Sequence, residues 1–174
     1  MALGKNTKAY ETPNHPYQGG RIAQEHDLVG RYGLKNKEEL WRAESELRSY
    51  RREARELVGR SQGDAEEAAR QGAGFLSRLK RLGILDEGET LGDVLSLDVT
   101  DVLERRLQTV VYRRGLANSP KQARQFISHG HVRVGDRCVR VPSYKVDADV
   151  ESEIAFTENS ALADDLHPER AEEQ

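Results

Sequence analysis

The chain is poor in the residues that build large cores and covalent cross-links. Its 174 residues include one cysteine, one tryptophan, one methionine and three phenylalanines. The single thiol, Cys138, excludes an internal disulfide and suits a reducing compartment, so we expect a cytoplasmic protein. No apolar run approaches the roughly 18 residues of a membrane span, and residues 1–10 lack the apolar core of a signal peptide. We therefore expect one or two small domains and no contact with a membrane.

Charge is abundant instead, and it is unevenly distributed. Charged residues make up 33% of the chain, which carries a net charge of −3. Residues 101–145 contain ten Lys/Arg and three Asp/Glu, a net charge of +7, whereas residues 146–174 carry −9. One compact positive segment inside an acidic protein indicates a polyanionic partner, and RNA is the leading candidate.

The start of the positive segment has the pattern of an amphipathic helix. Over residues 101–113 the apolar residues recur at helical spacing, and Gly115 follows as a stop signal. The apolar side carries Leu103, Leu107, Val110 and Val111. The other side carries Arg105, Gln108, Thr109 and Tyr112, with Arg106 and Arg113 at its edge. We expect this polar side to face outward.

A second helix begins at residues 119–122. Ser119 is a capping residue, Pro120 fits the first helical position, and Gln122 completes a capping box. The apolar face then carries Ala123, Phe126 and Ile127, and the opposite face carries Lys121, Arg124, Gln125 and Ser128. The free N–H groups at the start of such a helix suit phosphate.

A short β-hairpin follows, with Gly135-Asp136 as its turn. This turn pairs Arg133 with Cys138. The face predicted to cover the helices carries Val132, Val134, Val139 and Val141, and the other carries His131, Arg133, Cys138 and Arg140. The alternation of residues 154–156 predicts a final strand on the same sheet. Arginines often merely solvate helix faces, but here three elements each combine an apolar side with a basic side, which favours RNA binding.

At these residues the chain resembles the small RNA-binding module named after ribosomal protein S-four. The matching stretches read RLQ at 106–108, RRGLA at 113–117, Ser119, ARQFI at 123–127, HGHVRV at 129–134 and PSY at 142–144. Further stretches at 10–13, 15–16, 28–30, 32–34, 36–37, 41–42, 83–88 and 103–108 resemble the archaeal and eukaryotic branch of the S-four ribosomal protein family. The resemblance covers roughly residues 5 to 157.

The resemblance implies a structural protein of the small ribosomal subunit. Members of that family bind the 5′ domain of small-subunit rRNA, nucleate assembly of the body, and lie beside the mRNA entrance among other small-subunit proteins. They contact small-subunit protein five and contribute to decoding accuracy. No catalytic residue and no cofactor is implied.

The sequence and the resemblance together predict an α+β protein with a helical N-terminal part and a module of two helices packed on a short sheet with a hairpin. We divide the chain into an extended arm and short helix (1–35), a helical domain (36–100), the RNA-binding module (101–159) and an acidic flexible tail (160–174). Asn36 and Glu39 form a predicted capping box at the start of the helical domain. A later helix is expected from Asp64 to Gly72, resuming at Phe75.

The candidate rRNA contacts are the basic, aromatic and polar residues on the outward faces of the module. They are Arg105, Arg106, Tyr112, Arg113, Arg114, Ser119, Lys121, Arg124, Gln125, His129, His131, Arg133 and Arg140. Further candidates in the N-terminal part are Lys5, Lys8, His15, Arg42, Arg51 and Arg52.

Other functions find less support. His129, His131 and Cys138 are one ligand short of a structural zinc site, so no metal site is expected. An RNA-modifying enzyme carrying the same module needs a large catalytic domain, for which the roughly 100 preceding residues, read as helical, leave no room. A free RNA chaperone remains an alternative, although the long N-terminal resemblance argues against it.

The acidity of the chain suggests adaptation to molar salt. Arginine outnumbers lysine by 20 to 7. At about 1 M salt the Debye length is only about 3 Å, so an acidic surface repels RNA little beyond contact range. Arginine still holds phosphate there through bidentate hydrogen bonds. We therefore expect a protein of a salt-accumulating archaeon.

Overall fold

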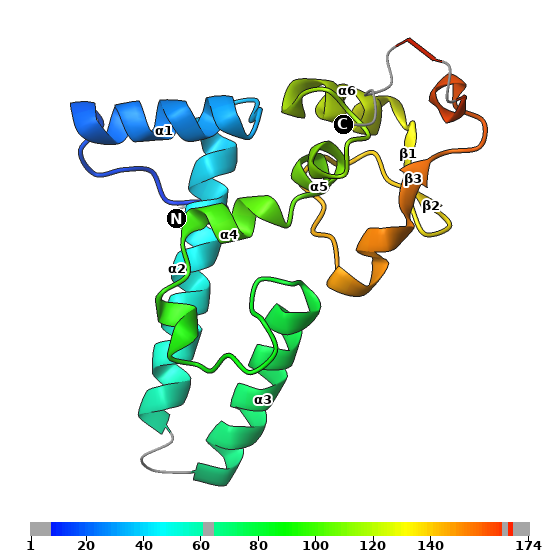
Figure 1. Ribbon diagram of the computed structural model, residues 1–174. Helices are drawn as coiled ribbons and strands as arrows, with labels where there is room; N and C mark the ends of the chain where they lie inside the picture. Colours follow the sequence, from blue (N-terminus) through cyan, green and yellow to red (C-terminus); the bar gives the residue numbers. More distant parts are fainter. Residues whose placement is uncertain (1–7, 61–64, 165–166, 169–174) are drawn as a thin grey trace, which may run out of the picture.

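The protein, seen in a computed structural model, combines a helical N-terminal half with a small α/β module, as predicted (Figure 1). The structure describes residues 8–60, 65–164 and 167–168. None of the helices in this part combines the length and the hydrophobicity that a membrane span requires. Lys5 and Asp64, which the sequence singled out, lie outside the described residues.

Three long helices build the N-terminal half. They are α1 (Gly19–Arg31), α2 (Lys37–Arg60) and α3 (Ala65–Arg81). The apolar stripe of α2 faces the core: Leu40, Ala43, Leu47, Ala54 and Leu57 are buried there together with Phe75 and Leu79 of α3. The expected break near Gly72 is wrong, because α3 continues through both of its interior glycines. Gly72 is buried, and a Cβ placed on it would lie 3.4 Å from the Leu91 side chain.

A short helical connection leads from α3 into the module. It contains the 3₁₀ turn η1 (Asp93–Leu95) and the helix α4 (Val99–Glu104), which Asp98 and Asp101 start with a reciprocal capping box. The single helix predicted for residues 101–113 is wrong: α4 ends at Glu104 and α5 (Leu107–Arg113) is a separate helix. Arg106 between them is extended, with φ −77° and ψ 138°, and forms a β-bridge with Lys145. This long-range pairing interrupts the helix.

The module packs α5 and α6 (Pro120–His129) on a three-stranded antiparallel sheet. The strands β1 (Val132–Val134), β2 (Arg137–Cys138) and β3 (Ile154–Phe156) lie in the order β2-β1-β3. The 3₁₀ helices η2 (Ala148–Glu153) and η3 (Ala161–Ala163) flank β3. The predicted hairpin register, Arg133 opposite Cys138, and the predicted final strand are both confirmed.

Two details of the module differ from the prediction. Val141 is 53% exposed, because β2 ends at Cys138 and the chain leaves the sheet before Val141. Leu162, beyond the predicted module boundary at residue 159, is buried in the module core. The first residues of the segment predicted as a tail therefore complete the module.

The molecule has two hydrophobic cores rather than one. The N-terminal core ends at Val102 and Leu103 of α4, and the module core begins at Leu107 of α5. The loop between α1 and α2 reaches across to the module, so that α1 and α6 lie at the same end of the molecule (Figure 1). Between the two cores lies a polar junction, which fixes how the two domains sit relative to each other.

Candidate RNA-binding surface

The outer side of α6 presents Lys121, Gln125 and Ser128, which the sequence placed there, but not Arg124, which turns to Glu39. Lys121, Gln125 and His129 are exposed, whereas Ala123, Phe126 and Ile127 are buried in the module core. Within the described part of the chain, Lys121 and Gln125 make no hydrogen bond or ion pair through their side chains. They are therefore available to a ligand.

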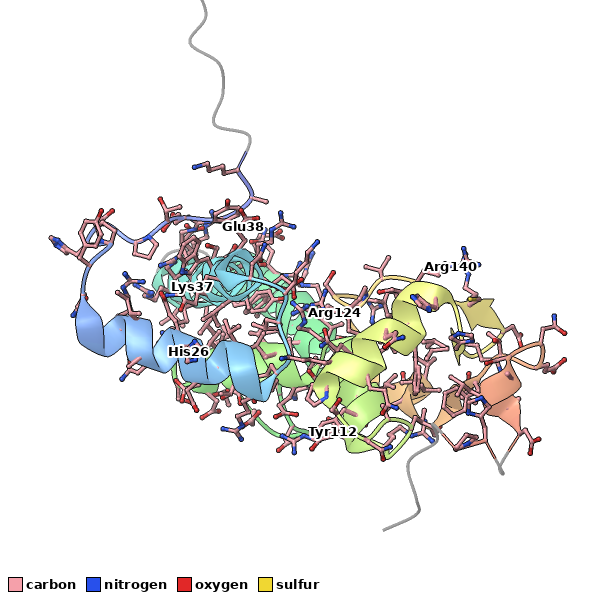
Figure 2. The ribbon with its side chains drawn as sticks, turned by 90° about the horizontal axis from the view of Figure 1, so that it is seen from above. His26, Lys37, Glu38, Tyr112, Arg124 and Arg140 are labelled. Atoms are coloured by element: carbon pink, nitrogen blue, oxygen red, sulfur yellow. The ribbon has the colours of Figure 1, made fainter. Side chains whose placement is uncertain are left out.

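Arg140 extends this surface from the hairpin side. It is exposed, and its guanidinium group lies over Gly130, the left-handed residue (φ +81°) that caps α6. A Cβ placed on Gly130 would lie 2.7 Å from Arg140 Nε, so only glycine permits both the cap and this approach. Figure 2 shows Arg140 on one side of α6 and Tyr112 of α5 on the other. Together these residues form a basic surface, here called the α6 surface: Tyr112, Lys121, Gln125, His129 and Arg140.

The start of α6 is capped as the sequence predicted. The Gln122 N–H donates to Ser119 Oγ at 3.2 Å. The Gln122 side chain accepts from the Asn118 N–H at 2.6 Å, one residue earlier than in a standard capping box. The Ser119 hydroxyl is thus engaged in starting the helix that carries Lys121 and Gln125.

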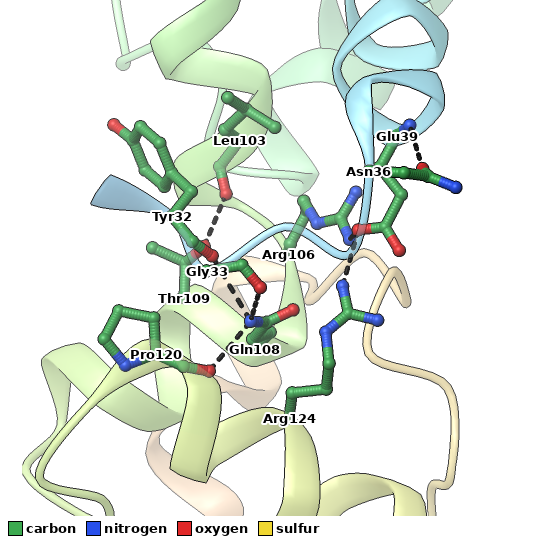
Figure 3. A network of polar contacts seen from close by, with 10 residues as sticks. All are labelled: Tyr32, Gly33, Asn36, Glu39, Leu103, Arg106, Gln108, Thr109, Pro120 and Arg124. Carbon is green, nitrogen blue, oxygen red and sulfur yellow. Dashed lines mark hydrogen bonds and ion pairs between the residues drawn. The ribbon is translucent and has the colours of Figure 1, made fainter. Parts of the chain in front are cut away.

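Arg106 and Arg124 do not belong to the α6 surface, and the predicted contact of Arg106 with RNA finds little support in its buried side chain. Both donate to the same carboxylate oxygen, Glu39 Oε2, from 2.7 and 2.5 Å (Figure 3). The Arg106 side chain is only 7% exposed and that of Arg124 is 22% exposed. These three residues, here called the Glu39 fork, join α2 to the module.

The Glu39 fork stays charged despite its burial. Burial raises the pKa of the Glu39 carboxyl, but hydrogen bonds and positive charge from Arg124 and Arg106 outweigh it, and the pKa falls below its usual value. Burial lowers the pKa of Arg106, and Glu39 opposes this shift. The predicted capping box at Asn36 is therefore half formed: Asn36 caps the Glu39 N–H at 3.3 Å, while the Glu39 side chain turns to the arginines.

Gln108 and Thr109, on the polar side of α5, face the N-terminal domain, contrary to prediction, whereas Tyr112 on the same side is only half-buried. Gln108 is fully buried, and its amide nitrogen lies 2.8–3.2 Å from the carbonyl oxygens of Tyr32, Gly33 and Pro120 (Figure 3). Thr109 is buried and donates to the Leu103 carbonyl at 2.8 Å. The sequence of α5 marks Gln108 and Thr109 as solvent-facing, but the N-terminal domain packs on them.

Three further candidate arginines hold the acidic segment that contains β3. Arg105 pairs with Glu151 at 2.8 Å, Arg114 donates to the Glu151 and Ile154 carbonyls, and Arg133 donates to the Phe156 carbonyl at 3.3 Å. The Arg105 side chain is only 14% exposed, whereas Arg114 is exposed. These side chains stabilise the sheet and its flanks.

Arg113 and His131 contact other residues of the protein, and Arg113 and His129 are also exposed. Arg113 is 53% exposed and pairs with Glu104 at 2.8 Å. His131 Nδ1 lies 2.8 Å from Ser160 Oγ, and the His131 ring packs edge-on against Phe126. Of the two histidines, only His129 is exposed. His129 and Arg113 therefore remain accessible candidates.

The N-terminal candidates lie on the arm and on α2. Lys8, His15, Arg42 and Arg52 are exposed. The Arg42 guanidinium lies 5.7 Å from the ring centroid of Tyr10, and Arg51 donates to the Leu97 carbonyl. The structure does not bring this group onto the α6 surface.

Sequence reasoning missed several residues that shape the site. Arg137 is exposed on the hairpin beside Arg140, and Arg31 is exposed at the end of α1. Glu25 is buried and binds Arg21, Lys37 and Trp41, which fastens α1 to α2. The charge of Arg137 could have suggested it as a candidate RNA contact. No local sequence pattern predicts that Glu25 is buried.

No metal site is found among the described residues, where no group of three or more His, Cys, Asp or Glu side chains is suited to a metal ion. Cys138 is exposed, and its thiol donates to the Gly130 carbonyl at 3.3 Å. The surface offers cations, amides and an aromatic ring. These are the groups that bind phosphate and bases.

Comparison with known proteins agrees with this geometry. Residues 105–152 match the S4 domain, which spans the hairpin and both module helices. A small ribosomal subunit protein uS4 from Natronomonas pharaonis is 69% identical over 174 residues, covering all of both chains. One from Haloarcula marismortui is 66% identical over 174 residues, covering 100% of this chain and 99% of the relative.

A more distant relative extends the comparison beyond halophilic archaea. The small ribosomal subunit protein uS4 of Methanococcus aeolicus is 49% identical over 166 residues, covering 95% of this chain and 93% of the relative. The similarity thus spans both domains and the junction between them. The chain belongs to the uS4 family of small ribosomal subunit proteins.

Proposed function

We propose that this chain is a structural constituent of the small ribosomal subunit that binds small-subunit rRNA through the α6 surface. The observation that carries this is the exposure of Lys121, Gln125, His129 and Arg140 on one side of an S4 domain, in a chain of the uS4 family. The protein acts as a scaffold and not as an enzyme.

The chemistry of the surface favours backbone recognition. Lys121 and Arg140 supply positive charge for phosphate, and the capped start of α6 adds a helix N-terminus. Gln125 and His129 add donors and acceptors for ribose and base edges. RNA helices that meet at a junction are read mainly by shape and phosphate position, which such a rigid face can match.

The finer role is that of a primary binder of the 5′ domain that nucleates assembly of the body. Its support is the resemblance of both domains to the family, together with the polar junction that holds them in one arrangement. A fixed arrangement suits a protein that must set the angle between RNA helices. On the same resemblance we place it beside small-subunit protein five and the mRNA entrance, with a contribution to decoding accuracy.

The remaining candidates are proposed as peripheral contacts. Arg113 and Arg114 flank α5 on the exposed side, and the arm and α2 contribute Lys8, His15, Arg42 and Arg52. Arg51, Arg105, Arg124, Arg133, Ser119 and His131 already have partners within the protein, so we assign them to support of the surface.

The test is binding of the full chain to an rRNA fragment that contains the 5′-domain junction, in molar KCl, against a scrambled RNA of equal length. Strong preference for the junction is expected. Equal and weak binding to both RNAs would contradict the proposal and favour a general RNA chaperone.

A further inference from the structure

A pocket lies where the C-terminal end of α1, the side of α5 that carries Thr109 and Tyr112, and the first turn of α6 meet. Its volume is about 230 Å³. Its lining comes from both domains: Arg31, Tyr32, Thr109, Tyr112, Arg113 and Pro120. The pocket therefore depends on the same junction that Gln108 and the Glu39 fork hold together.

Positive charge surrounds this pocket. Arg31 is exposed with its guanidinium 5.6 Å from the ring centroid of Tyr32, and Arg113 is 53% exposed. Glu104 accepts from Arg113 at 2.8 Å and from the Tyr32 hydroxyl at 2.8 Å, so one carboxylate faces two guanidinium groups. Pro120 is the first residue of the ten-residue helix α6, whose N-terminus adds a partial positive charge. The net field at the pocket suits a phosphate group.

The two tyrosines of the pocket differ in what they can offer. Tyr32 is 2% exposed, and burial beside Glu104 raises its pKa to about 12, so its hydroxyl is a fixed part of the wall. Tyr112 is half-buried, and its hydroxyl has no hydrogen-bond partner among the described residues. The Tyr112 ring, and not its hydroxyl, is the part of the side chain on which a base can stack.

We propose that this pocket takes one unpaired nucleotide of the RNA, with its base on Tyr112 and its phosphate between Arg31 and Arg113. The volume is below the 300–1,000 Å³ typical of pockets for drug-sized ligands and suits a single base. The inference rests on the proposed RNA-binding function. It extends the α6 surface onto the N-terminal domain through Arg31, a residue outside the matched S4 domain.

The first experiment measures binding of full-length variants to the junction RNA at several KCl concentrations, with thermal unfolding to confirm that each variant folds. The salt slope is the slope of the logarithm of the binding constant against the logarithm of the KCl concentration. Tyr112→Ala should weaken binding about tenfold and leave this slope unchanged. Tyr112→Phe should bind like the wild type. Arg31→Ala should flatten the slope by about one counterion. Arg70→Ala, which replaces another exposed arginine, on α3, is the matched control and should change neither quantity.

The second experiment places an abasic nucleotide at each unpaired position of the RNA in turn. One position should weaken wild-type binding about tenfold while leaving Tyr112→Ala unaffected, because both changes remove the same contact. If no position couples to Tyr112 while Lys121→Ala still weakens binding, the pocket is not a nucleotide site and the proposed function stands. If the wild type fails to distinguish the junction from scrambled RNA, both proposals fall.

Discussion

The junction between the domains and the α6 surface use the same residue types for opposite purposes. At the junction, Arg106 and Arg124 are mostly buried and share the Glu39 carboxylate. On the α6 surface, Lys121 and Arg140 are exposed, and Lys121 makes no ion pair within the described chain. All four cations fall within 35 residues of one another in the sequence. A positive segment of sequence thus mixes cations that hold the protein together with cations that we propose to bind RNA.

The difference follows from the cost of burying charge. A buried cation without a partner is strongly unfavourable, so the fold supplies Glu39 from the other domain. Arginine suits this place because its fork of donors stays charged when buried. An exposed lysine costs little to keep in water and is ready to exchange its counterion for phosphate. The following predictions separate the two classes.

The largest loss of stability is expected from adding a side chain at Gly33. Its φ of +58° is strained for other residues, and a Cβ there would lie 2.8 Å from Pro120 Cβ and 3.1 Å from Gln108 Nε2. Gly33→Ala should lower the free energy of unfolding by about 3 kcal/mol, since left-handed backbone alone costs about 1–2 kcal/mol. Chemical denaturation measures this. Gly30→Ala in α1, with open space at its Cβ, is the control and should be neutral or slightly stabilising.

The next largest loss of stability is expected from a substitution in the Glu39 fork. Glu39→Gln removes the charge that both arginines share, and we expect a loss of about 2 kcal/mol. This is less than the roughly 3–5 kcal/mol of a fully buried pair, because 21% of the Glu39 side chain is exposed. Glu38→Gln, the exposed neighbour on the same helix, should change stability by less than about 0.5 kcal/mol. Equal losses from the two variants would show that the fork does not stabilise the junction.

Acid should weaken the junction in a defined pH range. The pKa of Glu39 is lowered in the folded protein from a usual value of 4.5, so the unfolded chain binds the proton first as pH falls. The stabilisation is full above pH 4.5 and is lost as pH drops through the folded pKa. Denaturation at stepped pH should show this loss in the wild type. Glu39→Gln should show a shallower one, and identical pH profiles for both proteins would exclude Glu39 as a source of the dependence.

The smallest effect on stability is expected at the α6 surface. Lys121→Ala should leave the free energy of unfolding within about 0.5 kcal/mol of the wild type, because the side chain is exposed. Binding to the junction RNA should weaken several-fold, and the salt slope should flatten by about one. An unchanged slope would remove Lys121 from the RNA-binding surface.

The features that were predictable from sequence are the local ones. The cap at Ser119, the turn at Gly135 and the split of α6 into two faces each depend on residues a few positions apart, and all three are present. The break before α5 was not predictable, because it depends on the pairing of Arg106 with Lys145. The same holds for the fork, whose partners lie 67 and 85 residues apart. Gln108 looked solvent-facing because its burial requires a second domain.

The most direct measurement compares Arg106→Ala with Arg140→Ala in one assay of stability and RNA binding across KCl concentrations. Arg106→Ala should lower the free energy of unfolding by about 2 kcal/mol, since it leaves Glu39 with one partner, and should keep the salt slope of the wild type. Arg140→Ala should keep the stability and flatten the slope by about one counterion. A flattened slope with unchanged stability for Arg106→Ala would contradict the division between the junction and the α6 surface.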